Sequence, residues 1–353
     1  MLQISADILA LSTEAALILK NGRIAFANSA ACSILGDDCT GKTTRSVLGE
    51  SVAGTQANAF ICNLPIGGKH YIVRVNTLDG VRAVFLSSYE RSTALINDAL
   101  VYSLRNCLMS LGITTEMVRT RAEDADDRDL LRGLATITHD CYRINRMLSN
   151  VTVIRGINDG TLFCAMQQLD LSKLLNSLVN TVNLLIDSPQ VSISVPDGLQ
   201  IPADAALIET LVLNLISNCL VHAAGCTRIN LRVIDGRDCV ILSVDDDGCG
   251  ISAEDMSCVF DRYRHSFVMG ELGRGAGLGL TAVLGIARLH NGTLMLESRE
   301  GIGTTVRVSL SRSPGSTVEL CSHPAEPDSG MHEILTGLAD CLPDDRFSEK
   351  YLG

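Results

Sequence analysis

The fold of this chain is decided by the stretch Val244-Asp245-Asp246-Asp247-Gly248-Cys249-Gly250-Ile251. It follows the apolar run Val240–Val244, so the sequence predicts a strand that ends in a cluster of carboxylates. A carboxylate at a strand end can accept a hydrogen bond from an exocyclic amine, and Gly248 and Gly250 allow the backbone to approach a flat ring. Taken alone, the same residues would also suit an acidic turn.

An apolar helix pattern lies upstream and contains two asparagines. From Ile208 onward it includes Asn214-Leu-Ile-Ser-Asn218-Cys-Leu-Val-His222. Asn214 and Asn218 are four residues apart and share one helix face. Carboxamides on an apolar helix are costly unless their polar atoms find partners. The two residues therefore form either a ligand site or a satisfied buried pair.

Two glycine-rich segments lie downstream. Gly273-Arg-Gly275-Ala-Gly277-Leu-Gly279-Leu280 opens an apolar helix, where exposed amides and the helix dipole favour phosphate. The segment lacks the Lys-Ser/Thr ending of a P-loop and follows no parallel strand, so a dinucleotide fold is disfavoured. The second segment, Gly301-Ile-Gly303-Thr304-Thr305, lies between two strand-like runs and by itself would be a hairpin turn.

In this order and at these separations, the four segments closely resemble the ATP-binding domain of sensor histidine kinases, from about Leu169 to Ser311. The resemblance extends to Val259-Phe260-Asp261-Arg262-Tyr263-Arg264, which is similar to the phenylalanine-containing box of that family. Chaperone, mismatch-repair and gyrase ATPases share this fold. The form Gly-x-Gly-Leu-Gly-Leu and the helical hairpin upstream favour the kinase branch.

The resemblance implies a role for each matching residue. Asn218 would coordinate Mg²⁺, with Asn214 on the same face. Asp246 would bind the adenine amine, with Gly248 and Gly250 beside the ring and Thr304 completing the pocket. The loop glycines that would close over the phosphates of ATP are Gly275, Gly277 and Gly279.

Residues 91–157 are rich in helix formers and contain two heptad seams. The seam of the first half consists of Leu100, Leu104, Cys107, Leu111, Thr114 and Val118, and that of the second half of Leu130, Leu134, Ile137, Cys141, Ile144, Leu148 and Val151. Two helices in a hairpin cannot bury both seams alone. Pairing with a second copy would give a four-helix bundle, so the sequence predicts a homodimer.

The first ninety residues predict a small α+β unit. Asn21-Gly22 between two apolar runs is typical of a hairpin, and Asn28 and Gly36 suit the two ends of a short helix. Three alternating strands follow. The order of elements resembles a PAS sensor domain. No flavin-type cysteine motif is visible, so a chromophore is not supported. The sequence leaves two alternatives for this unit, a ligand-binding sensor and a ligand-free docking module.

The phosphoacceptor box of the family departs from its usual form here. The family has His-Glu-Leu-Arg-Asn/Thr-Pro, whereas this chain has Tyr102-Ser103-Leu104-Arg105-Asn106-Cys107. A phenol with a reference pKa near ~10 is a poor nucleophile at neutral pH without a base. Asn106 matches a position at which the family orients water for phosphatase activity. His139 is a candidate substitute for the missing acceptor. Counting ~1.5 Å per residue along each helix from a turn near Asp124, it lies about 10 Å from the level of Tyr102, so it is misplaced for that role.

Composition excludes several functions. The net charge of −11 over 353 residues argues against general nucleic-acid binding, which needs a basic footprint. The 13 cysteines show no metal-type pairing and indicate free thiols in a reducing compartment. No run is long and apolar enough for a spanning helix, and no basic leader precedes the N-terminal apolar stretch. We therefore expect a cytoplasmic protein without a membrane span.

These observations predict an α+β multidomain chain with four parts. They are a PAS-like sensor domain (1–90), an antiparallel helical hairpin that forms a dimeric four-helix bundle (91–160), an α/β sandwich ATP-binding domain (161–312) and a tail with a loosely docked end (313–353). The predicted function is that of a histidine-kinase-like enzyme that binds Mg-ATP and acts on a response-regulator receiver domain. The alternative is a pseudokinase or phosphatase-type regulator that docks such a partner without autophosphorylation on histidine.

Overall fold

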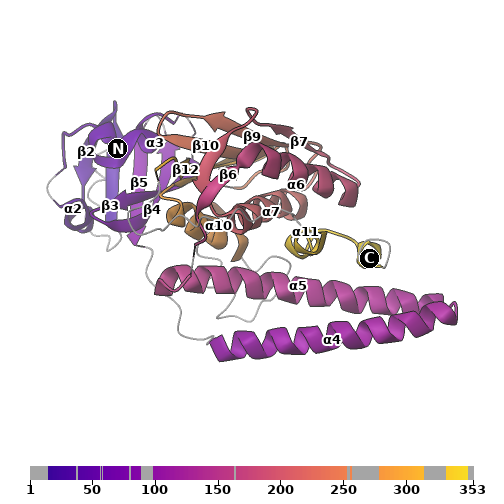
Figure 1. The fold of residues 1–353 in the computed structure, drawn as a ribbon. Coiled ribbons are helices and arrows are strands. Elements are labelled where there is room, and N and C mark those ends of the chain that lie inside the picture. Colours follow the sequence, from indigo (N-terminus) through magenta and orange to yellow (C-terminus); the bar gives the residue numbers. More distant parts are fainter. Residues whose placement is uncertain are drawn as a thin grey trace.

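The computed structural model describes residues 15–36, 39–55, 57, 59–78, 81–88, 98–162, 164–252, 255–256, 278–313 and 331–348. Figure 1 shows a broad body built on a sheet, with a long helical hairpin beneath it. A short C-terminal segment lies between the body and the hairpin.

The N-terminal unit is a five-stranded antiparallel arrangement with two helices. Its elements are β1 (Ala15–Lys20), β2 (Arg23–Ala27), α2 (Ser29–Leu35), α3 (Thr44–Ala53), β3 (Ala59–Ile66), β4 (Lys69–Leu78) and β5 (Val81–Ser88), with strand order β2-β1-β5-β4-β3. Asn21 and Gly22 both have positive φ, as a type I′ hairpin requires. The Asn28 side chain accepts a hydrogen bond from the Ala31 amide at 2.9 Å and begins α2. The predicted hairpin, capped helix and three strands are thus confirmed.

The second unit is an α/β sandwich. Its elements are β6 (Gln167–Asp170), α6 (Leu171–Leu185), β7 (Val191–Ser194), β8 (Gln200–Ala203), α7 (Ala205–His222), β9 (Ile229–Asp235), β10 (Cys239–Asp246), α10 (Leu278–Leu289), β11 (Leu294–Arg299) and β12 (Gly303–Ser311). The strand order is β11-β12-β10-β9-β7, with β7 parallel to β9 and the other neighbours antiparallel. Helices α6, α7 and α10 cover one face (Figure 1) and share its apolar core.

The prediction that no run is long and apolar enough for a spanning helix is wrong for α7, which by length and composition is the one described helix that could cross a membrane. Most of its residues are nevertheless buried inside the sandwich, including Leu211, Val212 and Ile216 at 0% exposure. Its apolar composition is therefore used in the core of this unit.

The two units share one ten-stranded sheet. Strand β3 pairs with β11, with Ile61 opposite Leu296 and Cys62 opposite Met295. Asn63 adds a hydrogen bond from the Leu294 amide to its side-chain oxygen. Each unit thereby covers an edge strand of the other. Sequence patterns predict the two units separately and give no signal for this pairing.

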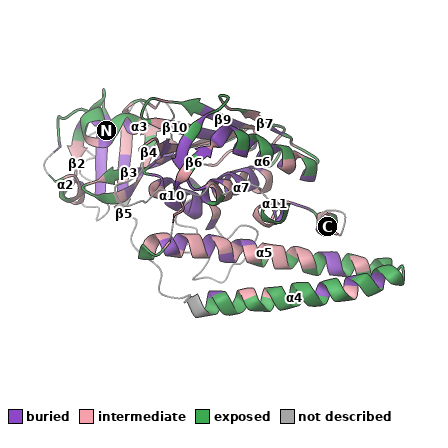
Figure 2. Ribbon diagram, viewed as in Figure 1, coloured by how far each residue is buried: buried purple, intermediate pink, exposed green. Residues whose placement is uncertain are grey.

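The hairpin consists of α4 (Asp98–Asp124) and α5 (Arg128–Asp159). The Asp127 side chain accepts a hydrogen bond from the Leu130 amide and begins α5. Helix α5 packs on α10, whereas α4 lies outside it and is largely exposed (Figures 1 and 2). Of the predicted seam, Leu134 is 5% exposed but Ile137 is 46% exposed. One copy of the hairpin therefore leaves much of its seam uncovered.

The C-terminal segment 331–348 contains α11 (Met331–Gly337) and the short 3₁₀ helix η1 (Asp344–Phe347). The prediction of a loosely docked end is wrong for this segment. Ile334, Leu335, Leu338 and Phe347 are all 0% exposed and belong to the core cluster that includes α6 and α7.

Candidate functional site

A cavity of about 300 Å³ lies between α5, α7, the end of β10, the start of α10 and the C-terminal segment. This volume is at the lower end of the range for small-molecule sites. The sequence-predicted residues that line it are Asn218, Asp246, Gly250, Gly279 and Thr304. Residues from five separate elements or loops are thus brought together at one site.

Only one of the three consecutive aspartates at the end of β10 lines this cavity. Asp245 accepts hydrogen bonds from Asn230 and Arg232, at 2.7 and 2.9 Å, on the neighbouring strand β9. Asp247 accepts hydrogen bonds from the Thr227 hydroxyl and from the amides of Thr227 and Arg228, and these bonds lower the pKa of its carboxyl. Asp246 lies between them and lines the cavity. The alternation of side chains along a strand explains why Asp246 points away from both neighbours.

The carboxyl of Asp246 is partly desolvated. Burial raises its pKa, while hydrogen bonds from the Gly248 amide and the Cys219 thiol act in the opposite direction. The Gly248 amide lies 3.0 Å from Oδ1. Thr304 stands opposite Asp246 in the register of β10 and β12. A carboxylate in this setting gains from a ligand that donates a hydrogen bond to it.

The glycines around Asp246 are required by close contacts within the chain. A Cβ on Gly248 would lie 2.4 Å from the Cβ of Ala223, and one on Gly250 would lie 2.2 Å from the Arg299 carbonyl oxygen. Gly250 also has φ +67°, which favours glycine. These contacts fix the wall of the cavity, and of the two glycines Gly250 lines it directly.

The opposite end of the cavity is formed by the start of α10. A Cβ on Gly279 would lie 2.8 Å from Oδ1 of Asn214 and 3.6 Å from Oδ1 of Asn218, so α10 and α7 approach closely there. Gly275 and Gly277, predicted to close over the phosphates, lie outside the described residues. The same holds for the box at 259–264.

The two asparagines of α7 have different surroundings. Asn218 is half-buried and lines the cavity. Asn214 is 4% exposed and exchanges hydrogen bonds with Asn150 of α5, at 3.0 and 3.2 Å. Its Nδ2 also donates to the Thr210 carbonyl oxygen at 2.9 Å. Asn214 is therefore a buried asparagine whose polar atoms are satisfied within the chain, and it does not line the cavity. Asn218 does line the cavity and is the candidate ligand-binding residue.

Sequence reasoning missed three polar residues at this end of the site. Arg146 of α5 and Asp340 of the C-terminal segment line the cavity, and so does Asn150. Arg146 and Asn150 are one turn apart on α5, outside the heptad seam. Two polar residues four positions apart lie on the same face of a helix, so this spacing could have predicted a polar site on α5. Asp340 carried no comparable signal.

The residues of the phosphoacceptor box lie on α4, away from the cavity lining. Tyr102 is 68% exposed and Asn106 is also exposed. Arg105 donates to Thr152 at 3.2 Å, which fixes this part of α4 beside the end of α5. The turn is centred on Asp126 rather than Asp124, so His139 lies about 16 Å along the hairpin from the level of Tyr102, at ~1.5 Å per residue. The separation predicted from the sequence, about 10 Å, was too small.

Comparisons with known proteins add to this geometry. Residues 203–314 match a family model described as "Histidine kinase-, DNA gyrase B-, and HSP90-like ATPase". The sensor-like histidine kinase SenX3 of Mycolicibacterium smegmatis is 24% identical over 232 residues, which cover 65% of this chain and 60% of SenX3. The histidine protein kinase DivJ of Caulobacter vibrioides is 38% identical over 116 residues, covering 33% of this chain and 19% of DivJ.

Two solved structures are also similar. The ATP-binding domain of PrrB from Mycobacterium tuberculosis is 25% identical, with a TM-score of 0.35, covering 42% of this chain and 98% of that one. The histidine kinase ThkA, crystallised with the response regulator TrrA, is 17% identical, with a TM-score of 0.38, covering 88% of this chain and 99% of that one. Among the curated relatives, the matched part spans 56–60% of the length of the SenX3 proteins.

Proposed function

We propose that this chain is a member of the sensor histidine kinase family, that its cavity binds ATP with Mg²⁺ and that the protein signals in a two-component pathway; the matches to the ATPase family model and to SenX3 support the family. The observation that carries the proposal is the partly desolvated carboxyl of Asp246, which lines the cavity opposite Thr304. An exocyclic adenine amine would donate a further hydrogen bond to this carboxylate, whose two oxygens can together accept about four.

The residues present suit both groups. Asp246, Gly250 and Thr304 would hold the adenine. Asn218 and Gly279 lie at the other end of the cavity, where the phosphates and the metal would be. Among the described residues, no cluster of three or more His, Cys, Asp or Glu side chains could hold a metal. The side-chain oxygen of Asn218 would be a ligand of Mg²⁺, an ion that commonly keeps water and substrate phosphates as its other ligands.

Two activities are compatible with this site. In the first, the protein is a kinase that positions the acceptor against the transferred phosphoryl group, and Mg²⁺ held at Asn218 would supply charge neutralisation there. In the second, it is a pseudokinase or phosphatase-type regulator that binds ATP without autophosphorylation on histidine. Tyr102 at the acceptor position and the exposed Asn106 favour the second activity.

Calorimetry of the full chain with Mg-ATP tests the binding site. Asp246→Asn should weaken binding by about 10- to 100-fold, since hydrogen bonds to charged groups contribute roughly 1.5–3 kcal/mol. Asp245→Asn is the matched control, because that side chain pairs with the partly exposed Arg232 instead. Asn218→Ala should weaken binding only when Mg²⁺ is present. Unchanged affinity in both site variants would refute the assignment.

Incubation with γ-labelled ATP, with and without receiver domains, then distinguishes the two activities. Phosphohistidine is lost in acid, whereas phosphotyrosine survives it. We expect no acid-labile label on the hairpin. Strong acid-labile labelling that disappears in His139→Ala would support the kinase and contradict our use of the hairpin register.

Three further assignments complete the proposal. The N-terminal unit has the strand order β2-β1-β5-β4-β3 with helices between β2 and β3, which supports a PAS-like sensor. The exposed seam of the hairpin supports a homodimer with a four-helix bundle. A response-regulator receiver domain in the cytoplasm is the partner that the family implies.

A further inference from the structure

The C-terminal segment 331–348 is packed directly on the α/β sandwich of residues 167–311, which is called the ATP-binding unit below. Ile334, Leu335 and Leu338 are fully buried in the core that α6 and α7 share. Gly337 permits a close approach to α7, because a Cβ there would lie 2.6 Å from Cδ1 of Leu213. The segment is therefore held as part of this unit and not as a free tail.

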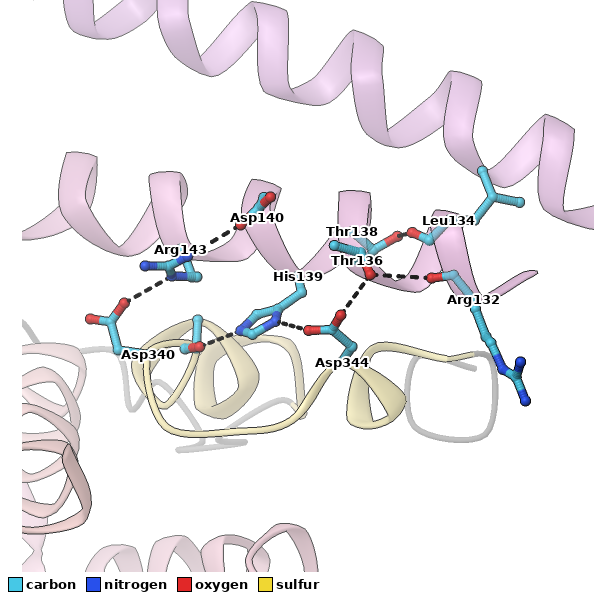
Figure 3. A network of polar contacts seen from close by, with 10 residues as sticks. Arg132, Leu134, Thr136, Thr138, His139, Asp140, Arg143, Asp340 and Asp344 are labelled. Atoms are coloured by element: carbon cyan, nitrogen blue, oxygen red, sulfur yellow. Dashed lines mark hydrogen bonds and ion pairs between the residues drawn. The ribbon is translucent and has the colours of Figure 1, made fainter. Parts of the chain in front are cut away.

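The same segment is bound to α5 through His139. The two ring nitrogens of His139 lie 2.6 Å from Oδ1 of Asp344 and 2.6 Å from the Ala339 carbonyl oxygen. Thr136 donates to the other oxygen of Asp344 at 2.6 Å (Figure 3). Phe347 stacks on the imidazole with ring centroids 4.4 Å apart. One short segment thus joins the hairpin to the ATP-binding unit.

Asp340 lies where these contacts meet the cavity. Its Oδ2 is 2.6 Å from Nη1 of Arg146. Its Oδ1 is 3.3 Å from Nε of Arg143 (Figure 3). The side chains of Arg146 and Asp340 are only 9% and 15% exposed. Nη2 of Arg146 donates to Oδ1 of Asn214 at 3.3 Å. Because Asn214 also borders Gly279, the pair lies at the end of the cavity assigned to the phosphates.

We propose that segment 331–348 is an internal clamp whose Asp340 competes with the phosphates of ATP for Arg146, so that docking of the segment and binding of ATP weaken each other. The inference rests on the proposed ATP site. A guanidinium pairs with a carboxylate or a phosphate in the same way. A buried carboxylate beside an incoming polyanion repels it, and the repulsion is poorly screened at low exposure.

The coupling has a defined consequence for each ligand state. When Asp340 holds Arg146, the segment keeps the ATP-binding unit against α5. When the phosphates take Arg146, the carboxylate loses its most buried partner and the segment is held less firmly. Linkage requires that the two effects be equal in free energy, whichever event comes first.

The test compares Mg-ATP and adenosine binding to the full chain and two variants. Asp340→Asn should bind ATP about tenfold more tightly than the unmodified protein, within the usual range of coupling between sites. Adenosine binding should not change, because adenosine has no phosphate. Asp345→Asn removes one charge from the same segment without lining the cavity and should bind ATP normally.

Hydrogen–deuterium exchange of the unmodified protein provides a second measurement, independent of any variant. Saturation with Mg-ATP should raise exchange in residues 331–348, and adenosine should not. Equal ATP affinity in all three proteins, or unchanged exchange in the segment, would overturn the clamp while leaving the ATP site in place. Absence of ATP binding to all three proteins would overturn the proposed function and the clamp with it.

Discussion

Phe347→Ala is the sharpest test of how firmly the C-terminal segment is docked. Phe347 is 0% exposed, stacks on His139 and lies 5.1 Å from the ring of Tyr142 between centroids. Truncation of a buried phenylalanine costs about 3–5 kcal/mol, and loss of an aromatic pair contributes about 0.5–1.5 kcal/mol beyond burial. The site is near the end of the chain segment and can partly collapse, so we expect a loss of about 3 kcal/mol.

Urea unfolding followed by far-ultraviolet circular dichroism measures this loss, since the chain has no tryptophan. Leu184→Ala is the control, because that side chain is 72% exposed and its truncation should change the free energy of unfolding by less than about 0.5 kcal/mol. Phe347→Leu keeps most of the volume and should cost about half as much as Phe347→Ala. A loss below about 1 kcal/mol in Phe347→Ala would refute the packing argument and restore the loosely docked tail.

Two other perturbations test separate parts of the molecule. Burial lowers the pKa of His290, whose Nε2 accepts a hydrogen bond from the Asp204 amide. Below pH ~6.5 the unfolded chain therefore binds a proton at this residue more readily than the folded chain does. The free energy of unfolding should consequently fall as the pH drops below that value. Urea titrations from pH 8 to 5 should show a smaller slope for His290→Gln, and equal slopes would contradict this. The double variant Ile137→Glu, Ile144→Glu puts unpaired charge into the hairpin seam and should sediment as a monomer. Ile302→Glu, at an exposed position outside the seam, is the control and should leave the dimer intact. A dimer that persists in the double variant would place the interface elsewhere.

Local signals in the sequence were enough for most elements. Asn21-Gly22 sets the first hairpin because both residues adopt positive φ, and Asn28 begins α2 with its own side chain. The apolar run Val240–Val244 predicted a strand where β10 lies, and the apolar pattern opened by Gly273–Leu280 predicted a helix where α10 lies. Each of these depends on neighbours within a few residues, which is the range over which sequence patterns are informative.

Contacts between distant segments could not be predicted in the same way. The pairing of Ile61 with Leu296 joins strands β3 and β11. Either strand could also have been the unpaired edge of its own sheet, so nothing in the sequence favoured pairing them. Helix α11 has only seven residues, too few for a periodic pattern to identify a buried face. Asp340 follows it in an irregular stretch, and its partners Arg143 and Arg146 lie almost two hundred residues earlier.

Helix α5 links the exposed seam to the cavity by its own geometry. At 100° per residue, Ile144 and Arg146 are about 200° apart around the helix, and Ile137 and Arg146 are about 180° apart. Ile137 and Ile144 of the seam are 46% and 38% exposed, whereas Arg146 is buried against Asn214. One face of α5 thus carries exposed apolar side chains, while the opposite face reaches the α/β sandwich. Any rotation of α5 that changes the packing of Ile144 must also move Arg146 relative to Asn214. Because Asp340 pairs with Arg146, the same rotation would change the contact between α5 and the C-terminal segment.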